Sequence, residues 1–109
     1  MEDKKATIRS LNDSLRTTFL GGRVLITASV QSLPEVLRSR ALSAVREFRD
    51  FNEDDEPHGE HDFGAFDMAE HTFFWKIDYH DESECQGSVD PSDPEKAIRV
   101  LTVMLAEDY

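Results

Sequence analysis

The chain has 109 residues, a mass of 12.5 kDa and a formal net charge of −11, with 39% hydrophobic and 32% charged residues. This length supports one domain over residues 1–109 and is too short for two hydrophobic cores. A membrane span needs an apolar run of ~18 residues, which is missing here. The single cysteine cannot form an internal disulfide. The negative charge opposes direct binding to nucleic acid or anionic lipid. We therefore expect a cytoplasmic protein, a monomer or small homo-oligomer, without a cofactor.

The negative charge is concentrated in the middle of the chain. Residues 50–95 contain sixteen Asp and Glu side chains against one cation, Lys76. Residues 1–49 have an excess of positive charge, and residues 96–109 are balanced, so the middle segment accounts for the whole negative excess. Such asymmetry within one chain indicates a partner that is recognised by electrostatics.

The N-terminal part of the chain predicts a helix followed by a strand. Apolar residues at spacings of three and four predict a helix from about Asp3 to Phe19, ended by Gly21 and Gly22. The run over residues 23–30 is rich in β-branched side chains and predicts a strand that is covered on both faces.

A second helix is predicted after this strand. The spacing of Ser32 and Glu35 matches a capping box, so the helix begins near these residues. Apolar periodicity extends it over residues 33–51, and a basic stripe outside the apolar face is formed by Arg38, Arg46 and Arg49. A solvated helix face, or a contact to the protein's own acidic segment, would explain this stripe without a partner.

Residues 73–79 give the clearest strand signal, because large apolar side chains alternate with mostly polar ones. The large side chains are those of Phe73, Trp75, Ile77 and Tyr79. Residues 62–68 predict an antiparallel partner, joined through residues 69–72 as a hairpin. Gly64 in this partner would allow an aromatic side chain to approach closely across the pair.

The C-terminal part of the chain predicts a helix. Residues 92–95 combine a capping serine, a proline and acidic side chains, as is typical of a helix start. Apolar residues between Ala97 and Leu105 would cover more than half of the helix circumference, which favours a buried, central helix. The predicted fold is α+β with the order αβαββα, a small antiparallel sheet with helices packed on one face, and the C-terminal helix central.

Four runs of the sequence are characteristic together: Gly21-Gly22-Arg23-Val24, Gly59-Glu60-His61-Asp62-Phe63-Gly64, Phe74-Trp75-Lys76-Ile77-Asp78-Tyr79, and residues 99–109. With these runs the chain resembles a small bacterial family known only as a domain of unknown function. The resemblance covers about residues 11–109 and implies a short, acidic, single-domain bacterial protein. His80 stands where the resemblance leads us to expect a second tyrosine. The family implies no activity.

The histidines suggest a metal site as one alternative function. All four lie between residues 58 and 80 among carboxylates, and residues 58–81 offer both nitrogen and oxygen ligands. However, the sequence has neither the His-Glu-x-x-His pattern nor a Cys/His set with the spacing of a zinc site. A polar surface loop explains the cluster equally simply, so we expect no metal ion and keep a small metal-dependent enzyme or metal-binding protein as the alternative.

Two further chemistries are considered and not favoured. Two carboxylates among Glu60, Asp62, Asp78 and Asp81 could lie across the hairpin as a general acid and base, but the sequence does not single out a pair and Cys85 lies in an acidic loop that would blunt a thiolate. The hairpin aromatics could stack bases, but only Lys76 accompanies them, and core packing explains their alternation. We therefore expect no catalysis.

The leading hypothesis assigns function to the acidic surface of residues 50–95. Carboxylates on a rigid scaffold can imitate nucleic-acid phosphates and occupy the cationic site of a bacterial nucleic-acid-binding complex, as anti-CRISPR or anti-restriction inhibitors do. The expected contact residues are Asp50, Glu53, Asp54, Asp55, Glu56, Glu60, Asp62, Asp81, Glu82 and Glu84. Acidity that only maintains solubility, or a structural or self-assembling domain, would explain the same composition.

Overall fold

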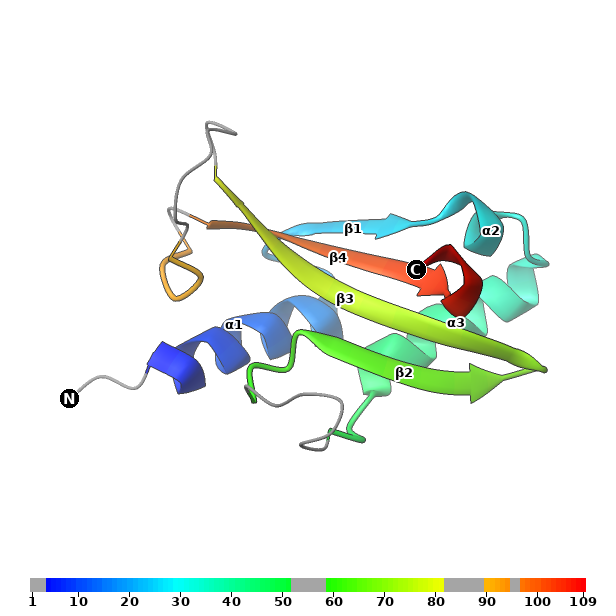
Figure 1. Cartoon of the computed structure of the whole chain (residues 1–109), viewed down its shortest axis with the longest axis horizontal. Coiled ribbons are helices and arrows are strands. Elements are labelled where there is room, and N and C mark those ends of the chain that lie inside the picture. Colours follow the sequence, from blue (N-terminus) through cyan, green and yellow to red (C-terminus); the bar gives the residue numbers. More distant parts are fainter. Residues whose placement is uncertain (1–3, 52–58, 82–89, 95–96) are drawn as a thin grey trace.

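The computed structural model describes residues 4–51, 59–81, 90–94 and 97–109. Its elements, in chain order, are α1 (Lys4–Thr18), β1 (Arg23–Ile26), α2 (Ala28–Gln31), α3 (Glu35–Glu47), β2 (Phe63–Met68), β3 (His71–Asp81), β4 (Ala97–Leu105) and the 3-10 turn η1 (Ala106–Asp108). The fold is α+β, with α1 and α3 on one face of a four-stranded sheet (Figure 1). The predicted fold class and the placement of the long helices on one face are confirmed.

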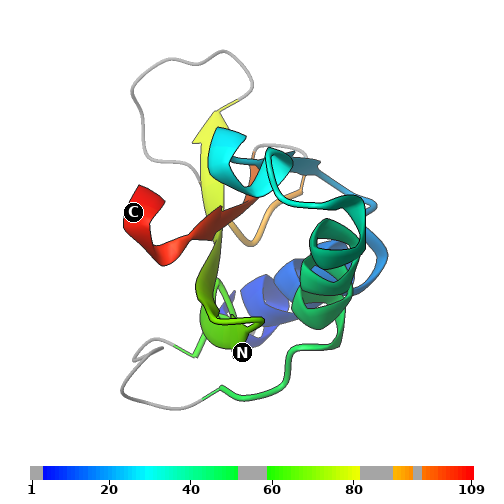
Figure 2. The ribbon, with the colours of Figure 1, turned by 90° about the vertical axis from the view of Figure 1, so that its right-hand side faces the viewer.

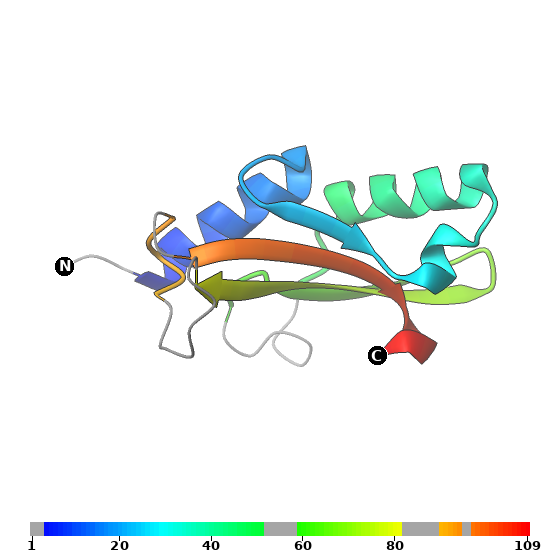
Figure 3. The ribbon, with the colours of Figure 1, turned by 90° about the horizontal axis from the view of Figure 1, so that it is seen from above.

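The sheet has the strand order β1-β4-β3-β2. The β2–β3 and β3–β4 pairs are antiparallel, whereas β1 is parallel to β4, so the sheet is mixed and not antiparallel throughout as predicted. The parallel pair arises because the chain leaves β1 through α2 and α3 and returns to it only after the hairpin. Viewed along the sheet edge, α1 and α3 lie on one side and η1 lies on the other (Figure 3).

The predicted C-terminal helix is wrong, because residues 97–105 form the strand β4. A run that is apolar almost throughout suits either a buried helix or a strand covered on both faces, and periodicity alone does not separate the two. The β-branched residues Ile98, Val100, Thr102 and Val103 favour the strand. Residues 90–93 form a turn in place of the predicted helix start, in which the Ser92 backbone N–H donates to Asp90 Oδ1 at 3.0 Å. The terminal element is nevertheless central, since β4 lies between β1 and β3.

The strand predicted over residues 23–30 ends earlier than expected. Thr27 caps the short helix α2, with its side chain accepting from the Val30 backbone N–H, so only Arg23–Ile26 pair with β4. Ser32 ends α2, and its hydroxyl donates to the Ala28 carbonyl at 2.9 Å. The capping box predicted from Ser32 is therefore wrong: α3 is preceded by Pro34, without a side-chain cap.

The antiparallel hairpin is confirmed, but its turn is shorter than the predicted connection of residues 69–72, because His71 and Thr72 already pair in β3. Residues 63–68 pair with residues 71–76, and Ala69 and Glu70 form the turn with positive φ angles of 51° and 66°. Gly64 lies opposite Trp75, and a Cβ at this position would overlap the indole ring. The close approach expected at Gly64 is therefore present, and it lets the largest core side chain lie flat against the neighbouring strand.

The core fills the space between the sheet and the helices. Its main cluster contains Leu15, Val45, Phe48, Trp75, Ile77, Leu101 and Val103, and a second cluster near α2 contains Val30, Ala41, Phe73 and Leu105. The apolar stripe predicted for α1 supplies Leu15, which confirms the helix and its inward face. Figure 2 shows α1 and α3 side by side against the sheet. No helix among the described residues is both long and apolar enough to cross a membrane.

Candidate functional site

Three polar or charged side chains are buried in the described part of the protein, and they all face the boundary between α1 and the sheet. Asn12 and Arg16 lie one turn apart on α1 with exposed fractions of 0% and 4%, and Arg99 on β4 is 3% exposed. Burying such groups is unfavourable unless each is hydrogen-bonded, so their partners identify what this region holds in place.

Asn12 is the centre of a hydrogen-bond network that joins distant parts of the chain. Its Nδ2 donates to the Glu60 carbonyl at 3.0 Å and to the Tyr79 hydroxyl at 2.8 Å. Its Oδ1 accepts from Arg99 Nε at 2.7 Å, and Arg99 also donates to the carbonyl of Pro91. One buried amide thus connects the segment before β2, the centre of the sheet and the segment before β4.

Burial changes the acid–base properties of this network. Desolvation is the main reason why the pKa of Tyr79 is raised from 10.0 to about 12, and the nearby carboxylates of Asp62 and Glu60 raise it further, whereas the hydrogen bond from Asn12 opposes the shift. Desolvation also lowers the pKa of Arg99, whose guanidinium lies 5.2 Å from the centre of the Tyr79 ring. The fold therefore favours a neutral phenol beside the buried guanidinium.

We predict that Tyr79 ionises at about pH 12 in the folded protein. Because its folded pKa exceeds the unfolded value of 10.0, its contribution to stability is complete below pH 10 and is lost as the pH rises toward 12. Subtracting the ultraviolet titration curve of Tyr79→Phe from that of the wild type isolates this tyrosine. A difference curve centred at the ordinary tyrosine value would contradict the buried network.

Arg16 holds the end of α3 against α1. Its Nη1 donates to three carbonyls in the last turn of α3, those of Val45, Arg46 and Phe48, at 2.8–3.3 Å. The Val45 carbonyl also accepts from the Phe48 backbone N–H at 3.3 Å, so the guanidinium adds to the cap of α3 from another element. The same guanidinium lies 5.2 Å from the ring centre of Phe51 and 5.4 Å from that of Trp75.

Two residues of the basic stripe predicted on α3 also donate hydrogen bonds to backbone carbonyls outside that helix. Arg38 donates to the carbonyls of Gln31 and Leu33, and Arg46 donates to the carbonyl of Thr17 at 3.2 Å. Both side chains therefore cap neighbouring backbone instead of forming a purely solvated face. Arg49 is exposed and lines the cavity described next.

A histidine–carboxylate pair lies next to Arg16. His61 Nδ1 is 2.9 Å from Asp13 Oδ1, and Arg16 Nη2 is 3.1 Å from the same oxygen. The imidazole stacks on Phe51 with ring centres 3.7 Å apart. A cavity of about 340 Å³ opens beside this pair and is lined by Asp13, Arg16, Thr17, Phe48, Arg49, Phe51 and His61. The pair orients the start of β2 against α1 and α3.

The N-terminal half of α1 also contacts the residues that follow two acidic segments, 52–58 and 82–89. Arg9 Nε donates to the Gly59 carbonyl at 2.8 Å, directly after residues 52–58. Lys4 Nζ lies 3.4 Å from Asp90, directly after residues 82–89. Hydrogen bonds from Ser92, followed by the contact with Lys4, lower the pKa of Asp90. Together with Asn12 and Arg99, these contacts fix where both segments rejoin the fold.

The predicted contact residues are described only in part. Asp50 is exposed after α3, and Glu60 and Asp62 are half-buried beside Tyr79. Asp81 is the last residue of β3, but its side chain lies outside the described residues. Also outside them are Glu53, Asp54, Asp55, Glu56, Glu82 and Glu84.

Of the four carboxylates considered as a general acid and base, Glu60 and Asp62 lie on one side of the sheet and Asp78 lies on the other, while the side chain of Asp81 is outside the described residues. Glu60 and Asp62 lie near Tyr79, on the side of α1, whereas Asp78 alternates to the opposite face and pairs with Lys76 at 3.1 Å. Within the described ranges, no three or more His, Cys, Asp and Glu side chains are grouped so that they could hold a metal ion. His58 lies outside those ranges.

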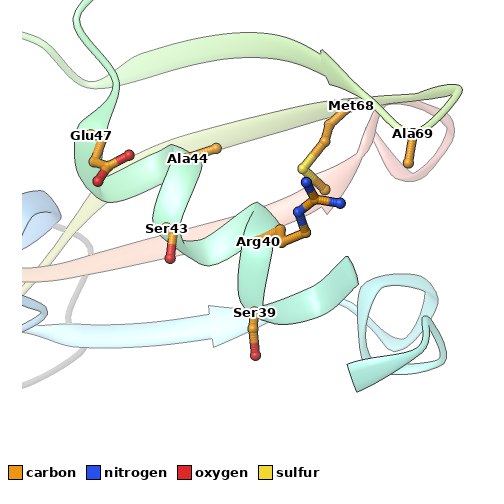
Figure 4. Close-up of a pocket in the computed structure, with 7 residues that line it drawn as sticks. All are labelled: Ser39, Arg40, Ser43, Ala44, Glu47, Met68 and Ala69. Carbon is orange, nitrogen blue, oxygen red and sulfur yellow. The ribbon is translucent and has the colours of Figure 1, made fainter. Parts of the chain in front are cut away.

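A second cavity lies away from this network, between α3 and the turn of the hairpin. It has a volume of about 520 Å³ and is lined by Ser39, Arg40, Ser43, Ala44, Glu47, Met68 and Ala69 (Figure 4). Arg40 and Glu47 lie two turns apart on α3, and the rest of the cavity lining consists of small side chains and Met68. None of the buried polar residues lines it, so it is separate from the Asn12 network.

Sequence reasoning did not identify Asn12, Arg16 or Arg99 as important. The periodicity of α1 places Asn12 and Arg16 beside the apolar stripe, where a polar side chain is usually solvated. Arg99 interrupts the apolar run of residues 97–105, and this was the one available signal: a charged residue within a buried element requires a partner. Misassigning that run as a helix concealed which side of it Arg99 occupies.

Comparison with known proteins gives one family match. The model of a family described as protein of unknown function, DUF3768, matches residues 26–108. No curated protein and no solved structure matches the chain. The match includes Glu60, Tyr79 and Arg99, whereas α1 with Asn12 precedes it.

Proposed function

Since the chain belongs to the DUF3768 family, whose function is unknown, we propose from its charge and geometry that it is a non-catalytic binding protein. Its acidic surface binds the cationic nucleic-acid site of a larger bacterial protein complex and keeps nucleic acid out. A defence complex of the restriction or CRISPR type is the partner class that this mode of binding would inhibit. The contact surface is the set of ten carboxylates named above, from Asp50 to Glu84.

The observation that carries the proposal is the shared attachment of the two acidic segments. Glu60 and Pro91, which follow residues 52–58 and 82–89, are joined through Asn12 and Arg99 by one buried network. Two further contacts come from α1: Arg9 contacts Gly59, and Lys4 contacts Asp90. The residues that directly follow the two segments are therefore anchored to one part of the fold, α1 and its buried network.

The charge of these segments is large compared with that of the scaffold. Residues 52–58 and 82–89 contain six carboxylates and no Lys or Arg. The cations of α1 contact the ends of the segments, at Gly59 and Asp90, so they neutralise part of the attachment region. A dense group of carboxylates can displace the counterions of a cationic groove as phosphates do.

The proposal is tested with a charge-reversal variant in which Glu53, Asp54, Asp55 and Glu56 are changed to lysine. Wild-type protein immobilised on a resin is expected to capture a nucleic-acid-binding protein from a bacterial lysate at low salt, and the four reversals should abolish the capture. Added DNA or RNA should compete with binding, and raising the salt concentration should weaken it steeply. Circular dichroism of each variant checks that the fold is intact.

A matched control separates the acidic surface from net charge alone. Reversal of Glu35, Glu47, Glu70 and Glu107 changes the net charge equally at positions outside the proposed contact set, and it is expected to retain binding. If both variants lose the partner to the same extent, or if binding ignores salt, the acidic surface is not a specific site. Capture of no protein at any salt concentration would also reject the proposal.

A further inference from the structure

The face of the sheet opposite α1 and α3, called the open face here, carries apolar side chains that the helices do not cover. In register across all four strands lie Leu25, Thr102, Lys76 and Phe63. The next row along the sheet includes Phe74 and Ala65, which are half-buried, and Met104, which is buried. The helices α1 and α3 lie on the other side (Figure 3). A sheet face exposed to water normally carries polar residues, so this composition indicates a contact surface.

The C-terminal turn makes the open face uneven. Asp108 accepts hydrogen bonds from Thr27 at 2.8 Å and from Ser29 at 2.7 Å, and these bonds hold η1 over the sheet. Tyr109 then packs edge-on against Phe74 and Phe63, with ring centres 5.5 and 6.3 Å apart. Tyr109 is nevertheless 77% exposed, so its ring is a projecting apolar knob.

A groove lies beside this knob. It has a volume of about 470 Å³ and is lined by Thr27, Lys76, Thr102, Met104, Asp108 and Tyr109. Leu25, which is 52% exposed, neighbours Thr102 across the strand pair. The open face thus presents a knob and a groove next to each other. A surface that carries both can be complementary to itself about a two-fold axis.

The charges of the open face favour a second copy as the occupant. Its outward strand positions carry Arg23 and Lys76 against Asp67 and Asp78, and Asp108 of η1 adds one negative charge at the groove, whereas the chain as a whole has a net charge of −11. Lys76 and Asp78 are already paired at 3.1 Å. A nearly neutral, partly apolar face is therefore the part of this acidic molecule on which another acidic copy meets the least repulsion.

We propose that the open face is the interface of a two-fold homodimer, in which Tyr109 of each copy packs into the groove of the other, against Leu25. At spacings of about 4.8 Å between strands and about 3.4 Å per residue, the strands cover about 500 Å² per copy. Two copies then bury about 1,000 Å², which is the lower end for a specific interface. The dimer is accordingly weak and depends on protein concentration.

The homodimer is tested by sedimentation equilibrium of the full chain over a range of protein and salt concentrations. A reversible monomer–dimer equilibrium is expected. Tyr109→Ser and Leu25→Asp should each raise the dissociation constant at least about tenfold, since both remove central apolar contacts. Higher salt should tighten the dimer because it screens the repulsion between two chains of net charge −11. This salt dependence is opposite to that expected for partner binding by the acidic surface, so the two proposals can fail independently.

Two exposed apolar residues outside the open face serve as matched controls. Leu20→Asp and Val36→Asp, at positions 73% and 68% exposed, should leave the dissociation constant within about twofold. All four sites are at least half exposed, so the variants should fold, and thermal melting checks this. The proposal is overturned by a monomer at every soluble concentration, by a dimer that tolerates both Tyr109→Ser and Leu25→Asp, or by one that the control variants dissociate.

Discussion

Replacing Trp75 with alanine is expected to lower the free energy of unfolding by about 3 to 5 kcal/mol, the range for removing a fully buried large aromatic side chain. Trp75 is completely buried and contacts Phe48 and Phe51 edge-on, at 5.5 and 6.1 Å between ring centres. Its ring also lies beneath the guanidinium of Arg16. The substitution therefore leaves a cavity and weakens the contact that holds the end of α3. Urea unfolding followed by circular dichroism measures the change.

Gly64 supplies a specific control for this prediction. Gly64→Val alone should destabilise the fold, because a side chain there overlaps the indole of Trp75. In the Trp75→Ala background, Gly64→Val should lower the free energy of unfolding by less, since the added methyl groups enter the cavity left by the indole. We expect a coupling energy of at least about 1 kcal/mol in the double-mutant cycle. Additive effects, or a loss below about 1 kcal/mol for Trp75→Ala, would show that Trp75 does not pack as described.

The contrast between the hairpin and β4 shows which parts of this fold are encoded locally. Residues 73–79 alternate with a period of two because one face of β3 meets the core and the other is partly exposed, so the pattern reveals both the strand and its inward side. β4 is covered by neighbours on both edges and buried almost throughout, and its sequence loses that period. Only its place between β1 and β3, which is set by distant residues, decides its conformation.

Of the candidate site, only the excess of negative charge could be predicted from the sequence. Composition identifies the excess of carboxylates in residues 50–95, but it does not reveal that the segments on which many of them lie attach to the same helix. That attachment depends on Asn12 meeting Glu60 and Arg99, which are 48 and 87 residues away along the chain. Neither local propensity nor periodicity carries information about such separations, and a single buried asparagine looks like any other polar residue of an amphipathic helix.

Replacing Asn12 with leucine is expected to lower the free energy of unfolding by about 2 to 4 kcal/mol. Leucine has the same number and branching of side-chain heavy atoms, so the main loss is of the three hydrogen bonds of Asn12. The Nε of Arg99, only 3% exposed, would then lack its acceptor, and the Glu60 carbonyl would lose its donor. Arg99 would keep its bond to the Pro91 carbonyl, but a buried charged donor that loses one acceptor costs more than that bond itself contributes. Urea unfolding measures the total effect.

The same variant tests whether this network holds the acidic segments in place. Amide hydrogen exchange in Asn12→Leu should accelerate both at residues 59–62 and at residues 90–93, because one side chain serves both attachments. Asn12→Asp keeps an acceptor for Arg99 but cannot donate when ionised, so it should free mainly the Glu60 side. Tyr79→Phe removes a single bond and should cost about 1 kcal/mol. Faster exchange on only one side in Asn12→Leu would mean that the two acidic segments are attached independently, and the shared rigid base assumed for partner binding would not exist.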